Sequence, residues 1–262
     1  MLHVLLGALI NFGALGFSPA SSAPANIGAA SSALSVAPAR KTGETRNSSD
    51  ILAASAVKAR LDALVPAYLR SYFDLYLFVS KARLGGAAQR MFIFERDVAQ
   101  GFAFSQMWLV STGREQAEQY FTTTPAGLFK LDPQRFFTLT HSQRWRGAAM
   151  PHAMFFDYRY RTRASGLAIH AASRSAVADL GNRASGGCVR LHPDNARALF
   201  ETIKAKYAGK VPEFVFDEQN GTTNRQGKVV RNEKGRIVLA DGYRVLLVVD
   251  DFAGSQIAVR AD

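Results

Sequence analysis

The middle of the chain is built from short apolar or alternating runs separated by turn residues. Five such runs are rich in aromatic and β-branched residues: Tyr76–Val79, Arg90–Phe94, Phe102–Val110, Gly127–Leu131 and Phe136–Thr140. Three more follow later in the chain: Glu213–Phe216, Arg236–Leu239 and Arg244–Val249. Runs of this length and composition are typical of β-strands. The pattern therefore predicts a mainly β domain.

Two segments have helical spacing instead. Asp50 is a suitable N-cap, and apolar residues then recur every three or four positions as far as Pro66. We expect this helical segment, residues 50–74, to pack on the β domain. A second helix is predicted from Pro193, a residue suited to a first turn, to Gly209, a residue suited to a helix end. Its apolar face is formed by Ala196, Leu199, Phe200, Ile203 and Tyr207.

The N-terminal part of the chain differs in its composition and in its pattern of apolar residues. Residues 4–17 form an apolar stretch of signal-peptide length, too short to cross a bilayer, followed by small residues suited to cleavage after Ala20 or Ala23. Residues 24–49 are rich in Ala, Ser, Pro and Thr, which predicts a flexible linker. We expect residues 1–23 to be a signal peptide and the protein to be exported to the periplasm or cell envelope, with no membrane span after cleavage. A signal peptide normally begins with basic residues, and no Lys or Arg precedes this stretch. An uncleaved anchor therefore remains an alternative interpretation of residues 4–17.

The overall composition is that of a globular protein with a sizeable core, but its charge is unbalanced. Of 262 residues, 48% are hydrophobic, and 32 Lys and Arg face 21 Asp and Glu, for a net charge of +11. Excess positive charge attracts polyanions such as nucleic acid, a membrane surface or an anionic cell wall. Expected export, and the lack of a dense basic run or helix-turn-helix pattern, count against nucleic acid. A solvated basic surface is the structural alternative.

The chain contains one cysteine, Cys188, directly after two glycines. A single cysteine forms no intramolecular disulfide, so it is either a small buried hydrophobe or a reactive thiol. A reactive thiol needs a cationic or proton-accepting neighbour. Among five histidines, His170 is the best candidate, because it ends an apolar run and is expected at the tip of a buried strand. His192 is expected to cap the second helix.

These residues form a recognisable pattern. Ile169-His170, fourteen further residues and then Ser185-Gly186-Gly187-Cys188-Val189-Arg190-Leu191 resemble the signature of the L,D-transpeptidase (YkuD-type) catalytic domain. Other segments occur in the family's order: Val110–Gly113, Thr124–Gly127, Met150–Pro151 with Phe155 and Phe156, and Asp194 at the following helix. Each motif alone is weak, but the ordered set is specific. The resemblance covers residues 75–217 and leaves residues 218–262 as a C-terminal β extension.

The resemblance implies a β-sandwich or barrel-like domain and an enzyme that modifies peptidoglycan without a cofactor or metal. Such enzymes attack a stem tetrapeptide through cysteine and pass the acyl group to an amine, forming a 3–3 cross-link. Cys188 would be the nucleophile and His170 the proton carrier, oriented by the backbone carbonyl of Ala171. A carboxylate is not required for that orientation, although Asp179 is a candidate.

The same resemblance suggests roles for the neighbouring residues. The amides of Gly187 and Cys188 are expected to face the oxyanion, with Gly186 allowing close approach and Ser185 supporting the turn. Many family members carry His in place of Gly186 and Gly in place of Ala171. Arg190 either lowers the thiol pKa, binds a substrate carboxylate or forms a structural ion pair. Three aromatic residues are candidates for lining the cleft, with burial in the core as the alternative: Trp108, Tyr158 and Phe156.

Several other functions remain to be weighed. Water as the acceptor would make the protein an L,D-carboxypeptidase or cross-link hydrolase with the same site. A non-catalytic cell-wall-binding module would suit the basic charge but would not need a Cys–His pair. A metal site formed by Cys188, His192 and His170 lacks a convincing fourth ligand. A papain-like protease requires the opposite order of cysteine and histidine.

Overall fold

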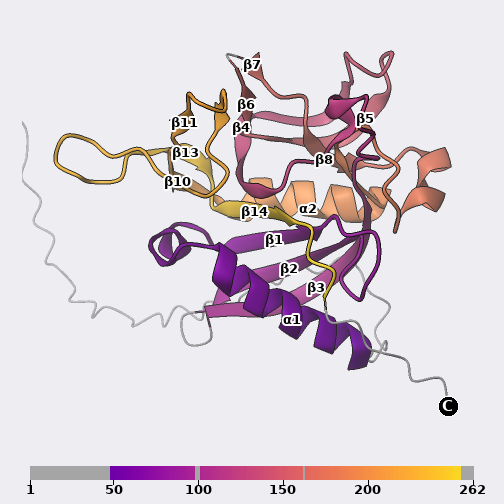
Figure 1. The fold of residues 1–262 in the computed structure, drawn as a ribbon, viewed down its shortest axis with the longest axis horizontal. Helices are drawn as coiled ribbons and strands as arrows, with labels where there is room; N and C mark the ends of the chain where they lie inside the picture. Colours follow the sequence, from indigo (N-terminus) through magenta and orange to yellow (C-terminus); the bar gives the residue numbers. More distant parts are fainter. Residues whose placement is uncertain (1–47, 98–100, 162, 255–262) are drawn as a thin grey trace, which may run out of the picture. The chain divides into compact units, whose positions relative to one another are not determined.

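The computed structural model of the protein describes residues 48–97, 101–161 and 163–254. Its helices are α1 (Ser48–Leu64), α2 (Pro193–Lys206) and the short 3-10 helices η1 (Ala67–Tyr72), η2 (Tyr120–Thr122) and η3 (Arg174–Asp179). Its longer strands are β1 (Leu75–Ser80), β2 (Arg90–Asp97), β3 (Gly101–Ser111), β4 (Gly127–His141), β5 (Ala149–Phe156), β10 (Ala208–Pro212), β13 (Leu239–Tyr243) and β14 (Val245–Asp250). The short strands are β6 (Arg159–Tyr160), β7 (Arg163–Ala164), β8 (Ala168–Ala171), β9 (Val189–Leu191), β11 (Phe216–Asp217) and β12 (Thr222–Thr223) (Figure 1).

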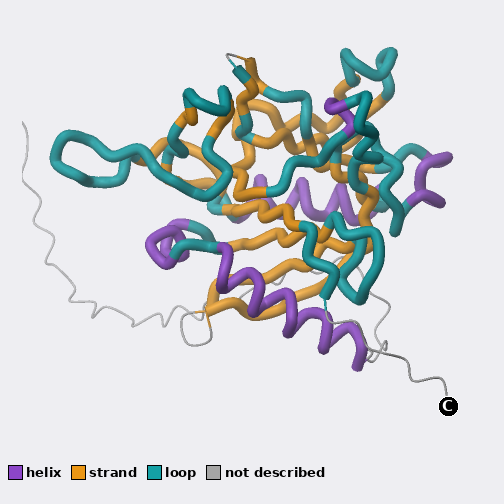
Figure 2. The backbone as a smooth tube through the Cα atoms, viewed as in Figure 1, coloured by secondary structure: helices purple, strands orange, loops and turns teal. Residues whose placement is uncertain are grey.

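Eight of these strands form a closed barrel. Their order around it is β1-β14-β4-β5-β8-β9-β3-β2, and Figure 2 shows how they dominate the fold. Neighbours are antiparallel except for the parallel pairs β1–β14 and β8–β9. The remaining strands form a two-stranded sheet, β10-β13, and a four-stranded sheet, β11-β12-β6-β7. The predicted class, a mainly β, barrel-like domain preceded by a helical segment, is confirmed.

Strand β1 illustrates why some barrel strands are apolar at every position of their sequence. All six of its residues are buried, because both faces of the strand are covered. Leu75, Leu77 and Val79 belong to the cluster that also contains the apolar face of α2. Tyr76 and Phe78 belong to a second cluster on the other face, which includes the buried residues of α1. Figure 1 shows α1 lying along β1, β2 and β3.

Strand β14 lies between β1 and β4, so residues near the C-terminal end of the described chain complete the barrel. Leu247 pairs with Leu77 on one side and Phe129 on the other. The described residues, 48–254 with the gaps given above, belong to one compact unit. The boundary after residue 217, like the other predicted domain boundaries, stays a prediction.

Some predicted elements differ from those observed. The two runs Gly127–Leu131 and Phe136–Thr140 form one strand, β4, in which an irregularity between Leu131 and Phe136 absorbs the turn residues. The helix predicted to reach Gly209 ends at Lys206, because the Tyr207 amide bonds back to Ile203 and the chain then enters β10. Asp50 lies in the first turn of α1 instead of at its N-cap.

The two later strand predictions hold only in part. The run Glu213–Phe216 contributes one residue to β11 and an isolated bridge between Phe214 and Val229. The run Arg236–Leu239 contributes the first residue of β13. The predicted signal peptide and most of the linker, residues 1–47, lie outside the described residues. Within residues 48–254, apart from the gaps given above, no helix has the length and apolar character needed to cross a membrane.

Replacing Leu247 with Ala should lower the free energy of unfolding by about 2–5 kcal/mol, because the side chain is fully buried between two barrel strands. Chemical denaturation followed by circular dichroism measures this loss. Leu239→Ala is the control, since Leu239 is 42% exposed and its truncation leaves no buried cavity. Equal losses in the two variants would contradict the placement of β14 inside the barrel.

Candidate active site

The parallel pair β8–β9 brings together residues that are distant in the sequence. Ile169 pairs with Val189 and His170 with Arg190. Because successive side chains of a strand point to opposite faces, Ile169 and Val189 enter the barrel core, and His170 and Arg190 lie on the other face. Cys188 directly precedes β9 and packs against a separate cluster formed by Met150, Ala153, Phe155 and Ala168. The cysteine and the histidine therefore share the face that is turned away from the core.

The His170 ring is held by the backbone next to it. Its Nδ1 lies 2.8 Å from the carbonyl oxygen of Ala171, the group that the sequence analysis named. A carbonyl only accepts hydrogen bonds, so Nδ1 carries the proton and Nε2 keeps its lone pair. Burial lowers the pKa of His170 to about 4, and the charge of Arg190 acts in the same direction, against the Ala171 hydrogen bond. At neutral pH the ring is an uncharged base.

Cys188 is uncharged as well. It is half-buried, and its thiol donates to the carbonyl oxygen of Gly166, with Sγ 3.6 Å from that oxygen. Burial raises the pKa of the Cys188 thiol, although a hydrogen bond that the sulfur accepts from the Ala168 backbone and the charge of Arg190 oppose this rise. Burial thus favours a thiol and a neutral imidazole over a thiolate–imidazolium pair.

The turn before Cys188 is fixed by Ser185. The fully buried Ser185 hydroxyl donates to the Cys188 carbonyl at 2.5 Å and accepts from the Gly187 amide at 3.1 Å. Gly187 has a φ of +111°, a conformation that favours glycine. Because the Gly187 amide is bonded to Ser185 here, it can meet an oxyanion only by exchanging that bond. The Cys188 amide is the other donor that the sequence analysis proposed.

Two segments singled out in the sequence hold this turn from the other side. The Thr124 hydroxyl donates to the Gly187 carbonyl at 2.8 Å and accepts from the Gly113 amide at 2.8 Å. Ser185 donates its amide to the Thr112 carbonyl at 2.9 Å. A Cβ at Gly113 would lie 2.0 Å from the Thr122 carbonyl oxygen, so only glycine fits. The segments Val110–Gly113 and Thr124–Gly127 thus converge on the turn that carries the cysteine.

The sequence of this region matches a family model. The model of the L,D-transpeptidase catalytic domain, YkuD, matches residues 76–231, more than half of the chain. The chain belongs to this family. No curated protein matches the chain.

Solved structures of L,D-transpeptidases resemble it at a distance. The LD transpeptidase LdtMt1 in complex with imipenem is 15% identical, with 68% of this chain and 59% of that one covered and a TM-score of 0.38. An L,D-transpeptidase from Mycobacterium smegmatis is 15% identical, with 68% of this chain and 59% of that one covered and a TM-score of 0.35. An L,D-transpeptidase from Mycobacterium tuberculosis H37Rv is 14% identical, with 68% of this chain and 58% of that one covered and a TM-score of 0.36. The match thus spans less than two thirds of the length of these structures, and the family assignment rests on the family model.

Trp145, which the sequence analysis missed, covers the turn of this YkuD domain. A Cβ at Gly186 would lie 2.4 Å from indole atoms of Trp145, so the ring occupies the space above that glycine. The Phe121 ring centroid lies 5.8 Å from that of Trp145, and the Arg114 guanidinium lies 5.3 Å from the indole centroid. This chain therefore has a glycine at position 186 with an indole packed on it. Trp145 lies in a loop, where no periodicity marks it.

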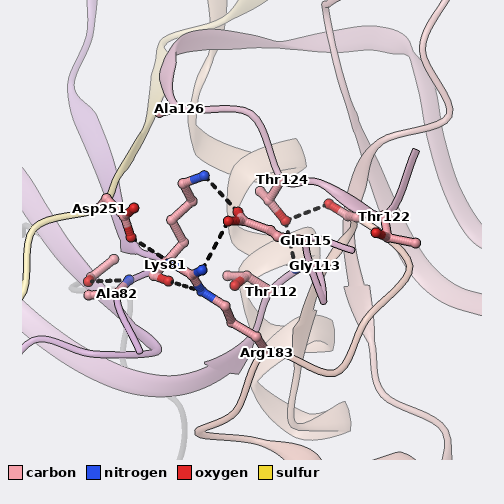
Figure 3. A network of polar contacts seen from close by, with 12 residues as sticks. Lys81, Ala82, Thr112, Gly113, Glu115, Thr122, Thr124, Ala126, Arg183 and Asp251 are labelled. Carbon is pink, nitrogen blue, oxygen red and sulfur yellow. Dashed lines mark hydrogen bonds and ion pairs between the residues drawn. The ribbon is translucent and has the colours of Figure 1, made fainter. Parts of the chain in front are cut away.

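An ion-pair network, also missed, supports the segment that leads to the turn (Figure 3). Arg183 contacts Glu115 at 3.0 Å and Asp251 at 2.6 Å, and its Nε donates to the Lys81 carbonyl at 2.6 Å. Lys81 in turn pairs with Glu115 at 2.6 Å. The Lys81, Glu115 and Arg183 side chains are 10–18% exposed. The network joins the ends of β1, β3 and β14 to the loop that precedes Cys188.

The remaining candidates lie elsewhere. Trp108 and Tyr158, each 8% exposed, and Phe156, fully buried, belong to the core cluster. His192 caps α2, as expected, by accepting from the Asp194 amide. Asp179 ends η3, and the Ala171 carbonyl is the group bonded to the His170 ring. Among the residues that the structure describes, no three His, Cys, Asp or Glu side chains are grouped to hold a metal ion.

Gly186→Ala should lower the free energy of unfolding by about 1–3 kcal/mol, because the new methyl group overlaps the Trp145 indole. In a Trp145→Ala background the same change should cost at least ~1 kcal/mol less, since the overlap is gone. Denaturant titrations of the four proteins give this coupling energy. Gly166→Ala is the control, because nothing lies within 4 Å of a Cβ there. An equal cost with and without the indole would contradict the packing described.

Proposed function

We propose that this protein is a cysteine-dependent peptidoglycan L,D-transpeptidase. It forms an acyl-enzyme at Cys188 from a stem tetrapeptide and transfers the acyl group to an amine, giving a 3–3 cross-link or attachment of a protein. The observation that carries this proposal is the position of Cys188 on the same strand-pair face as His170, whose ring is fixed by the Ala171 carbonyl. A cell-wall-binding module would have no use for a base held in this way beside a thiol.

The first step follows from the uncharged resting pair. When the scissile carbonyl approaches Cys188, the thiol proton moves to Nε2 of His170 while sulfur bonds to the carbonyl carbon. The carbonyl electron pair moves onto oxygen, where the Cys188 amide stabilises the negative charge, joined by the Gly187 amide once that amide exchanges its bond to Ser185. Imidazolium forms only at this stage, stabilised by the Ala171 carbonyl. Burial thus prevents ionisation before substrate binds.

The second half of acylation and the transfer use the same proton carrier. As the oxyanion collapses, the carbon–nitrogen bond breaks and His170 returns its proton to the amine of the leaving D-amino acid. A thioester remains on Cys188. An acceptor amine then attacks the thioester carbonyl while the imidazole takes a proton from it, and the departing sulfur recovers that proton. Water in place of the amine would give the carboxypeptidase or hydrolase reaction.

The expected setting agrees with this chemistry. The substrate is the peptidoglycan stem peptide, so the protein acts in the cell envelope, as the expected export also requires. The net charge of +11 favours contact with an anionic wall. The reaction needs no cofactor, since every proton transfer and charge described above is handled by Cys188, His170 and backbone groups.

Product analysis of the full chain with disaccharide-tetrapeptide tests the proposal. Cross-linked dimers are expected from the unmodified protein, none from Cys188→Ala, and about 10²–10⁴-fold less from His170→Ala, because the latter loses its general base. His192→Ala is the matched control, since that histidine only caps α2 and its loss should leave the rate nearly unchanged. Tripeptide without dimer would identify the hydrolytic alternative. No product of either kind would refute the enzyme assignment.

Acylation of Cys188 by a carbapenem should depend on pH in a way set by the uncharged pair. One of the related structures carries imipenem, which makes this class of reagent the natural probe. The rate constant is expected to be level across neutral pH and to fall as the pH drops toward the His170 pKa of about 4, because a protonated ring accepts no proton. Intact-mass spectrometry at timed intervals gives the rates. A loss of rate centred near 6.5 would instead indicate an ordinary, solvated imidazole.

A further inference from the structure

Arg183 is held in three directions, five residues before Cys188 (Figure 3). All three nitrogens of its guanidinium donate hydrogen bonds: Nε to the Lys81 carbonyl at 2.6 Å, Nη1 to Glu115 at 3.0 Å and Nη2 to Asp251 at 2.6 Å. Because a guanidinium is planar and its donors form a fixed fork, three such contacts fix the orientation of the whole group.

Glu115 is the anion at the centre of this ion-pair network. Each of its carboxylate oxygens meets a different cation, Lys81 at 2.6 Å and Arg183 at 3.0 Å. Its backbone has a φ of +54°, which residues other than glycine rarely adopt. Such a conformation persists only where the surrounding contacts fix it, and it is most common at functional sites. The two ion pairs supply part of this constraint.

Two chain segments leave the network side by side and lead to the cysteine. Gly113 forms a parallel bridge with Ser185, and the Arg114 amide donates to the Ser185 carbonyl at 3.0 Å. The Ser185 hydroxyl in turn donates to the Cys188 carbonyl at 2.5 Å. The network lies at the end of this pair of segments, so a change in their spacing displaces Ser185 and, through it, Cys188.

Asp251 connects the C-terminal part of the described chain to this arrangement. It directly follows β14, and the matched family model ends at residue 231. Its side chain is 60% exposed, and exposed ion pairs contribute little to stability. The neighbouring Asp250 pairs instead with Arg60 of α1, at 2.6 Å. Of two adjacent carboxylates, one is thus bonded to the helix and the other to the loop that precedes Cys188.

We infer that Arg183 is a positioning residue for Cys188, and that Glu115 and Asp251 hold it in the orientation that the reaction needs. This inference rests on the proposed function and adds residues that touch neither the substrate nor the reacting atoms. Acylation requires the sulfur to approach a carbonyl carbon while its proton passes to His170. A displacement of about 1 Å, caused far from the reacting atoms, can slow such a step by about 10²-fold.

Two reagents with different demands on geometry test this role on the full chain. A carbapenem requires an aligned thiol and imidazole, whereas iodoacetamide is small and requires only an accessible thiol. Arg183→Gln and Glu115→Gln should each lower the rate constant of acylation by about tenfold or more, and the rate of alkylation at Cys188 should stay the same or rise. Intact-mass spectrometry at timed intervals gives both rates.

Three further variants define the contacts that matter. Arg183→Lys keeps the charge without the planar fork, so its acylation rate should lie between those of the unmodified protein and Arg183→Gln. Asp251→Asn should slow acylation by about two- to fivefold, because an exposed ion pair contributes less. Asp250→Asn is the matched control: it removes the adjacent charge from the contact with α1 and should leave both rates unchanged.

Chemical denaturation shows whether each variant is folded under the conditions of the assay. Should Arg183→Gln fail to fold, Arg183→Lys and Asp251→Asn carry the test, since Asp251 lies largely at the surface.

Three results would overturn the inference: acylation at the unmodified rate in the folded variants of Arg183 and Asp251, an equal loss in Asp250→Asn, or alkylation that slows in parallel with acylation. The last result would mean that the network changes access to the thiol instead of its alignment. The unmodified protein separates this inference from the function on which it rests. If its thiol is alkylated but never acylated, the proposed function fails as well, whereas normal acylation with unaffected variants overturns the positioning role alone.

Discussion

The register of the parallel pair β8–β9 is the constraint on which the site depends. Ile169 and Val189 fill the core together, so His170 and Arg190 must come out together on the opposite face. Side chains of a strand alternate with a period of two, and a slip of one residue would reverse every position. Such a slip would bury charged Arg190 and expose Val189, at a large cost. The hydrophobic core therefore sets the geometry of the polar site.

The uncharged state of the cysteine and histidine follows from the same packing. Strands β8 and β9 exclude water from the side chains that lie beside them. Burial is therefore the main cause of the shifts in the pKa of His170 and Cys188. The Ala171 carbonyl suits this setting better than a carboxylate would, because it orients the ring without stabilising a permanent charge pair. In the proposed reaction, charge then develops only when substrate is attacked, beside a ring that the Ala171 carbonyl already holds.

Much of the fold could be predicted from the sequence, and so could the choice of Cys188 and His170 as the central residues of the candidate site. The order of the motifs along the chain indicated the family. The contact of His170 with the Ala171 carbonyl and the cap formed by His192 could be predicted because they join groups only one or two residues apart. Contacts between distant loops could not be predicted. Trp145 packs on Gly186 from a distant loop, and Arg183 contacts Glu115, 68 residues away in the sequence, with no periodic pattern at either end. Strand ends were missed where a bulge or a capped helix end took the place of a turn.

The place of β14 has a consequence for how the chain acquires its structure. Leu75 at the start of the barrel pairs with Val245, so β1 stays unpaired on that edge until the C-terminal part of the described chain has been made. Contacts so far apart in sequence form slowly and late. The barrel of a newly synthesised chain therefore cannot close until β14 has been made, which ties the whole β domain to one late pairing event.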